Sequence, residues 1–140
     1  MLPNMRFDTK IGIVVRSDLA AWQRLNVTAF LASAIAGGAP EVIGDDYEDG
    51  SGNPYLPMFR QPVVIYQADL DELRKVREKA KARDLRVAVY TEEMFKTGND
   101  EDNRAAVRAY SAEDLNLVGV SVYGPKTPVD KSLKGLTLHP

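Results

Sequence analysis

The stretch Lys10-Ile11-Gly12-Ile13-Val14-Val15-Arg16-Ser17-Asp18 decides the fold. Residues 10–16 are nearly continuous in apolar side chains, which is typical of a strand buried on both faces of a sheet. Asp18 stands where a helix N-cap is expected, since its carboxylate can accept hydrogen bonds from free backbone N–H groups. A long apolar helix pattern follows; Gly37-Gly38 ends it, and Pro40 prevents its continuation. A strand, a helix and a return to the sheet predict a βαβ opening.

The rest of the chain continues this alternation. Further strands are predicted over 62–67, 86–90 and 117–123, with a short one over 41–44. An amphipathic helix is predicted over 70–83, capped by Asp69 or Asp71, and shorter helices over 104–110 and 128–133. Gly119, inside a strand, indicates that a neighbour approaches its backbone closely. Two irregular segments remain, over 45–61 and 91–103.

This order of elements predicts an α/β fold in a single domain over residues 1–140. The predicted architecture is three-layered, α/β/α, with a mostly parallel, mixed sheet of four to five strands. A chain of 140 residues is long enough to bury a substantial core, and 44% hydrophobic with 27% charged residues is a globular composition.

Charge and cysteine content exclude several classes of function. The formal net charge of -2 argues against a surface devoted to nucleic acid, although a local basic patch at Lys126, Lys131 and Lys134 stays open. Solvation of the last helix is the simpler explanation of these lysines. The chain has no cysteine, so disulfides, thiolate metal sites and thiol nucleophiles are excluded.

No targeting or membrane segment is predicted. No apolar run approaches the roughly 20 residues that span a bilayer, and residues 1–9 lack the apolar core of a signal peptide. We therefore expect a cytoplasmic protein by default.

The sequence predicts no metal and no cofactor. The acidic stretch 45–50 is not an EF-hand, because Tyr47 occupies the third ligand position and Leu56 the twelfth. His139 is the only histidine and lies next to the C-terminus, where chain ends are usually mobile. Neither GxGxxG nor GxxxxGK[ST] occurs, so phosphate-binding loops of those kinds are absent.

A few polar and aromatic residues are candidates for a ligand site. Asn26 interrupts the first apolar helix, and a buried amide without partners costs about 1–3 kcal/mol. Thr97 and Asn103 flank a loop that leaves the carboxyl end of a strand, where open α/β sheets commonly bind ligands. Tyr47 and Tyr55, on the long loop, are placed to close over such a site. Each also has a structural alternative: turns favour Thr and Asn for local hydrogen bonds, and tyrosines anchor loops by packing.

The chain resembles two known families. Three segments resemble the type-II peptidyl-tRNA hydrolases: residues 10–18, residues 63–89, and Asn116 to Pro125 with Val129-Asp130 and Gly135-Leu136. The chain resembles more closely an uncharacterised bacterial family, catalogued as a domain of unknown function (number two thousand) and related to that hydrolase fold. The resembling stretches there are Asn26-Val27, Ile43-Gly44, Thr97-Gly98 with Asn103, and Lys134 to Pro140.

The hydrolase resemblance assigns positions to several residues. The hydrolases keep a lysine, a glutamine and a histidine along the first helix, and the matching residues here are Arg24, Thr28 and Leu31. Their aspartate after the third strand matches Glu92, and their threonine matches Lys96 or, with a one-residue slip, Thr97. Leucine cannot transfer a proton, so we expect chemistry other than that of the hydrolases.

Three hypotheses follow. The first is that the protein binds or hydrolyses a small ligand or ester-type substrate, with Glu92 as acid–base, Arg24 as electrostatic stabiliser and Asn26 beside them. In this hypothesis Thr97, Asn103, Tyr47 and Tyr55 contact the ligand. The second is a non-catalytic interaction protein that binds a protein partner, or itself as a homodimer, through an exposed sheet edge or helix. Peptidyl-tRNA hydrolysis is the third.

Overall fold

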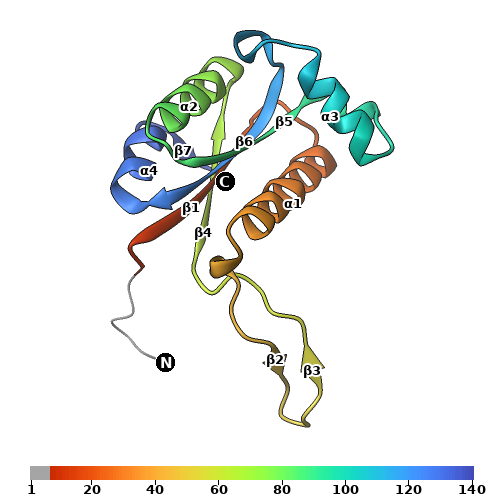
Figure 1. Ribbon diagram of the computed structural model, residues 1–140, viewed down its shortest axis with the longest axis vertical. Coiled ribbons are helices and arrows are strands. Elements are labelled where there is room, and N and C mark those ends of the chain that lie inside the picture. Colours follow the sequence, from red (N-terminus) through yellow and green to blue (C-terminus); the bar gives the residue numbers. More distant parts are fainter. Residues whose placement is uncertain (1–6) are drawn as a thin grey trace.

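Strand β1 (Thr9–Arg16) lies at the centre of a five-stranded sheet with the order β5-β6-β1-β4-β7 (Figure 1). The computed structural model describes residues 7–140. The other strands of this sheet are β4 (Val63–Ala68), β5 (Arg86–Thr91), β6 (Leu117–Pro125) and β7 (Thr137–Leu138). The predicted strands over 62–67, 86–90 and 117–123 are thus confirmed, and the short β7 was not predicted.

The α/β fold with a mixed sheet is confirmed, but the expected mostly parallel pairing is wrong. Only β1 and β4 pair in parallel, as the βαβ opening requires. The pairs β1–β6, β5–β6 and β4–β7 are antiparallel. The direction of β6 could not be predicted, because a strand buried on both faces is apolar throughout whether its neighbours run parallel or antiparallel.

Helices cover both faces of the sheet (Figure 1). Successive side chains of β1 point to opposite faces. Ile13 and Val15 pack in one core with side chains of α1 (Ala21–Gly38). Val14 packs in another core with side chains of α2 (Leu70–Ala82) and α4 (Lys126–Leu133).

Gly119 shows the close approach that its position in a strand predicts. A Cβ atom added there would lie 2.5 Å from Val27 Cγ1, 2.7 Å from Leu31 Cδ1 and 3.2 Å from the carbonyl oxygen of Val14. Helix α1 therefore packs directly against β6, and this contact sets the distance between the helix and the sheet.

The helix caps differ in how well they were predicted. Asp69 caps α2, since its carboxylate accepts a hydrogen bond of 2.8 Å from the backbone N–H of Glu72. The N-cap of α1 is Ala20, so the prediction that Asp18 caps this helix is wrong. The Asp18 carboxylate instead accepts a hydrogen bond of 2.7 Å from Arg16 Nε, a charged partner that the backbone N–H groups cannot match.

The two irregular segments contain short elements. Residues 45–58, here called the arm, carry the hairpin strands β2 (Tyr47–Glu48) and β3 (Pro54–Tyr55) and stand away from the sheet and its helices (Figure 1). The expected strand over 41–44 is wrong: the 3-10 turn η1 (Pro40–Val42) takes its place, and only Ile43 forms a bridge, to Phe59. After β5 come the 3-10 turn η2 (Glu92–Lys96) and α3 (Asp100–Arg108), which begins earlier than predicted; η3 (Ala112–Asp114) precedes β6.

None of the helices within residues 7–140 is both long and apolar enough to span a bilayer.

Candidate functional site

A cavity of about 350 Å³ lies between α1 and the segment that follows β5. We call it the groove. The groove brings together three of the residues selected from the sequence, Asn26, Thr97 and Asn103, although they come from two segments far apart in the chain. Its lining is Trp22, Asn26, Phe30, Tyr90, Met94, Phe95, Thr97, Gly98, Asn99, Asp100 and Asn103.

Two side-chain contacts organise its polar wall. Asn26 Nδ2 donates a hydrogen bond of 3.3 Å to Tyr90 Oη. The Thr97 hydroxyl contacts the Asn103 side chain and lies 2.9 Å from the carbonyl oxygen of Met94. Within the described part of the chain, no hydrogen bond uses the side-chain atoms Asn26 Oδ1 or Asn103 Nδ2. The groove therefore presents one free acceptor and one free donor.

Tyr90 is the buried member of this set. Only 4% of the residue is exposed. Burial raises the pKa of Tyr90 above its usual value, because the phenolate would lose its hydration; the hydrogen bond from Asn26 acts in the opposite direction. The hydroxyl is thus neutral at physiological pH and serves as a fixed polar group.

Aromatic rings form the rest of the wall. Trp22 meets Phe95 edge-on with ring centroids 5.7 Å apart, and Phe30 meets Tyr90 in the same way at 5.5 Å. Tyr90 and Phe95 join the two pairs at 5.3 Å. These separations are typical of favourable aromatic contacts, so the four rings form one continuous apolar surface.

A second cavity of about 460 Å³ continues the groove along α1. Phe30, Tyr90, Met94, Asp100 and Asn103 line both cavities. The second cavity adds two cationic side chains from α3, of which Arg104 pairs with Asp100 and Arg108 is exposed. The extended groove therefore runs from an aromatic end to a positively charged end.

Glu92 lies outside the groove, in a polar cluster at the carboxyl ends of β1 and β5. Its Oε2 accepts a hydrogen bond of 2.6 Å from Asn116 Nδ2 and lies 3.7 Å from Arg16 Nη2. The Arg16 guanidinium also donates to Asp18 at 2.7 Å and to Asn116 Oδ1 at 3.2 Å. These contacts fix the orientation of the Glu92 carboxylate at the carboxyl end of β5.

The remaining predicted residues lie elsewhere. Arg24 is partly buried on α1 and lines neither cavity. Tyr47 and Tyr55 face one another across the hairpin of the arm, both about half exposed, and do not line the groove of their own chain. The alternative that these tyrosines anchor a packed loop is wrong, because the arm carries them into solvent.

Sequence reasoning missed the aromatic wall and the partners of Glu92. Trp22 and Phe30 belong to the long apolar pattern of α1, which did not single them out as candidates for the site, yet Trp22 is 61% exposed. The signal that could have found them is the width of that stripe, which exceeds what one face of a helix can bury. Arg16 and Asn116 could have been found from the topology. Arg16 ends β1 and Asn116 directly precedes β6, so both lie at the same end of the sheet.

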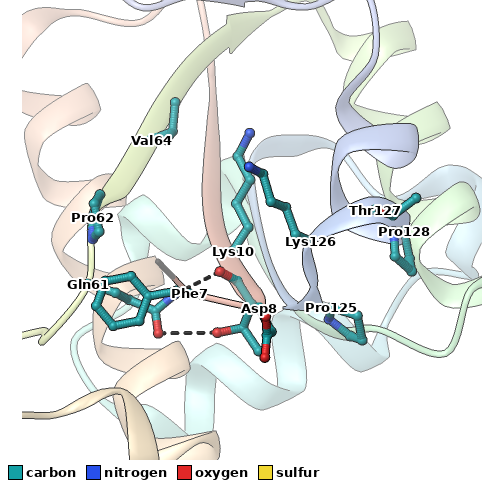
Figure 2. A pocket seen from close by; sticks show the side chains of 11 residues that line it. Phe7, Asp8, Lys10, Gln61, Pro62, Val64, Pro125, Lys126, Thr127 and Pro128 are labelled. Atoms are coloured by element: carbon teal, nitrogen blue, oxygen red, sulfur yellow. Dashed lines mark hydrogen bonds between the residues drawn. The ribbon is translucent and has the colours of Figure 1, made fainter. Parts of the chain in front are cut away.

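A larger cavity, of about 760 Å³, lies at the opposite end of β1 and is lined partly by Phe7, Lys10, Gln61 and Lys126. Figure 2 shows the side chains of Lys10 and Lys126 extending in the same direction. Its buried polar groups are already paired: Lys10 Nζ donates to Asp130 at 2.6 Å, and the Gln61 amide exchanges hydrogen bonds with Thr9. Of the residues selected from the sequence, it is lined by Lys126 of the possible basic patch, and by none of the candidates for the ligand site.

No group of three His, Cys, Asp or Glu side chains within residues 7–140 could hold a metal ion.

Comparison with known proteins gives a family and a fold. The family model described as "Protein of unknown function (DUF2000)" matches residues 9–140. Among solved structures, the chain is similar to a protein of unknown function from Agrobacterium tumefaciens strain C58, with 44% identity and a TM-score of 0.93 over 96% of this chain and 100% of that chain. None of the curated proteins compared with the chain matches it.

Proposed function

We propose a function from the geometry of the groove. The chain belongs to the family described as "Protein of unknown function (DUF2000)", and that description names no activity. The resemblance to an uncharacterised domain family is thereby confirmed. Our proposal is that the groove binds a small molecule that carries a flat ring with a polar edge.

The observation that carries the proposal is the meeting of a ring-lined cavity with two unused amide groups. A volume of about 350 Å³ lies in the range of roughly 300–1,000 Å³ typical of ligand pockets. The exposed rings of Trp22 and Phe30 offer edge and face contacts to a flat ligand. The side-chain atoms Asn26 Oδ1 and Asn103 Nδ2 would then orient its polar edge.

Charge in the second cavity refines the ligand class. Arg104 and Arg108 lie along α3 beyond the shared residues Phe30 and Asn103. A ligand long enough to reach them is expected to carry a negatively charged group there, since guanidinium groups pair well with carboxylate or phosphate. A small aromatic acid fits both ends of the extended groove.

The test uses Trp22 as its reporter, because the chain has one tryptophan and it lines the groove. Flat-ring compounds bearing an amide, carboxyl or amino group are titrated while Trp22 fluorescence and ligand-observed NMR are recorded. Binding that weakens at least about tenfold, or ~1.4 kcal/mol, in Asn26→Leu and Thr97→Val supports the proposal. Thr127→Val makes the same change at an exposed threonine of the 760 Å³ cavity and is expected to bind as wild type.

The same variants distinguish a structural role from a binding role. If both lose thermal stability while binding stays unchanged, Asn26 and Thr97 only hold the groove together. If no compound of the set perturbs Trp22 or shows contact by NMR, the proposal is wrong.

Hydrolysis of an ester is a second candidate, favoured by the cluster around Glu92. The carboxylate is exposed enough to reach a substrate, and Arg16 and Asn116 fix its orientation. A water held by Glu92 could attack an ester whose developing negative charge lies near Arg16. Turnover of p-nitrophenyl acetate that falls to the uncatalysed rate in Glu92→Gln would support this candidate, and equal rates would remove it.

Peptidyl-tRNA hydrolysis is the most specific form of that candidate. It requires contact with tRNA phosphates, so the affinity for tRNA must fall steeply as salt concentration rises. Affinity that is flat across salt, or absence of tRNA binding at low salt, contradicts it.

A further inference from the structure

Helix α1 carries large apolar side chains on both its inner and its outer side, which is unusual for a helix on a protein surface. Val27, Leu31 and Ile35 fill the core on its inner side. The outer side carries Trp22 and Leu25, which are 61% and 73% exposed. Arg24 is the only charged residue among its 18 residues and is itself partly buried. Apart from the edge-on contact of Trp22 with Phe95, the outer face of α1 is therefore an apolar surface that no other part of residues 7–140 covers.

The arm is a second such surface. Its large apolar side chains are exposed, with Leu56 at 84%, and they comprise Tyr47, Tyr55, Leu56 and Met58. The arm has a fixed shape despite this exposure. The Asp49 carboxylate accepts hydrogen bonds from the backbone N–H of Ser51 and Asn53 and, at 2.7 Å, from Tyr55 Oη.

We propose that these two surfaces cover each other in a homodimer, in which the arm of each copy lies along the outer face of the partner's α1. A second copy is the occupant that supplies both halves of the contact at once. The proposal concerns self-association alone and stands whether or not the groove binds the ligand proposed above.

The geometry excludes the same contact within one chain. The arm begins beyond the carboxyl end of α1, after η1, and points away from the helix (Figure 1). Trp22 and Leu25 lie at the other end of a helix of 18 residues, about 27 Å long at 1.5 Å per residue. A two-fold axis that packs two α1 helices antiparallel along their carboxyl-terminal halves places the arm of one copy beside the amino-terminal half of the other.

The outer face of α1 permits such packing. Ser33 is small and exposed in its carboxyl-terminal half, so two helices can approach closely there. Trp22 and Leu25, in the amino-terminal half, stay free to meet the arm.

The area is also sufficient. Seven large apolar side chains of α1 and the arm have exposed fractions of about one half or more. At roughly 200 Å² for a fully exposed large side chain, they offer on the order of 800 Å² per copy, which is what a standard interface requires.

The dimer would also complete the groove. The partner's Tyr47 and Tyr55 would lie beside Trp22, so the tyrosines assigned to the ligand site would contribute to it from the second copy. This consequence, unlike the dimer itself, rests on the proposed function.

The decisive experiment measures the mass of the full chain in solution by size-exclusion chromatography with light scattering. Wild type is expected at twice the mass of one chain. Leu25→Glu and Leu56→Glu are expected to be monomers, because each places a charge in the interface. Ala82→Glu adds the same charge on the exposed end of α2 and is expected to stay dimeric.

Every other result contradicts the proposal. Monomeric wild type at high concentration, or dimers that persist in both glutamate variants, would overturn it. Dimers lost in Leu25→Glu alone would show that the arm takes no part. Far-UV circular dichroism checks folding, and Leu25→Ser repeats the test without a new charge.

A cross-link tests the arrangement. Because the chain has no cysteine, engineered thiols are the only ones present. A tagged Leu25→Cys chain and an untagged Leu56→Cys chain are mixed, exchanged and oxidised. A mixed disulfide at least tenfold more abundant than that between Leu25→Cys and Ala82→Cys is expected; equal yields would rule out the arm on α1.

Discussion

Gly119 has no room for a side chain. An added Cβ would lie within 3 Å of Val27 Cγ1 and Leu31 Cδ1, both in the core beneath α1. We expect Gly119→Ala to lower the free energy of unfolding by about 1–3 kcal/mol, as overpacking of a core does. Urea unfolding measures this loss.

Gly37 provides the control. It lies in the last turn of α1, and an added Cβ there would meet no atom within 4 Å. Gly37→Ala is expected to leave stability unchanged or to raise it by up to about 1 kcal/mol. Equal losses in the two variants would mean that the approach of α1 to β6 is not the cause.

Tyr90 makes stability depend on alkaline pH. Burial raises its pKa in the folded state above the unfolded value of 10.0. The unfolded chain therefore loses this proton first, so the contribution of Tyr90 is fully present below pH 10 and is lost as pH rises toward the folded pKa. We expect the free energy of unfolding to fall more steeply between pH 9 and about 11 in wild type than in Tyr90→Phe. Parallel slopes in urea unfolding would contradict this.

Single residues were predictable where they break a pattern. Asn26 stands out in an apolar helix, and Thr97 and Asn103 stand out at the carboxyl end of a strand, so the polar wall of the groove was foreseen. Trp22 was not, because periodicity places apolar residues on a helix face but cannot say which face meets water. Its exposure depends on how much of α1 the sheet can cover.

The arm keeps its shape through Asp49 rather than through an apolar core. Hydrogen bonds from the Asn53 and Tyr55 side chains, more than those from the backbone, hold the pKa of Asp49 well below its usual range. These bonds are thus present at neutral pH and persist until pH falls far below 3.8.

We expect Asp49→Ala to speed backbone amide exchange at Ser51 and Asn53 at least tenfold, because both N–H groups lose their acceptor. Exchange in β1 and β6 should stay unchanged. Asp45→Ala removes an exposed carboxylate from the same arm and serves as control. Hydrogen–deuterium exchange with mass spectrometry measures both, and unchanged exchange after Asp49→Ala would mean that the hairpin itself orders the arm.

Long elements were predicted well and short ones poorly. β1, α1 and α2 carry enough periodic residues to be recognised, whereas β2, β3 and β7 have only two residues each. Asp18 was misassigned for a related reason. The sequence shows a good capping residue, but the competition from Arg16 appears only in three dimensions.

The whole molecule is expected to gain stability from association. Because the proposed dimer binds folded chains and not unfolded ones, the thermal midpoint should rise with protein concentration. Over a hundredfold change in concentration we expect a shift of several degrees, since RT ln 100 is about 2.7 kcal/mol. Scanning calorimetry of wild type and Leu25→Glu measures it, and the variant should show no shift. A concentration-independent midpoint in wild type would contradict the dimer.

For the whole molecule, the sequence predicted the fold class but not the direction in which the strands pair. Alternating strands and helices predict an α/β sheet, and one was found. The prediction of mostly parallel pairing was wrong because no residue of β6 indicates the direction of the strand. Its buried residues would suit a parallel or an antiparallel neighbour equally; they include Leu117, Val118, Val120 and Val122.

The late position of β6 in the chain has a consequence for synthesis. Strand β6 joins β5 to β1, so the first 116 residues emerge from the ribosome without the piece that unites their sheet. Until then both β1 and β5 expose backbone groups on the side that β6 will cover, a template for mispairing. We expect a nascent chain stalled before β6 is made to depend on chaperones, and a chain that contains β6 not to depend on them.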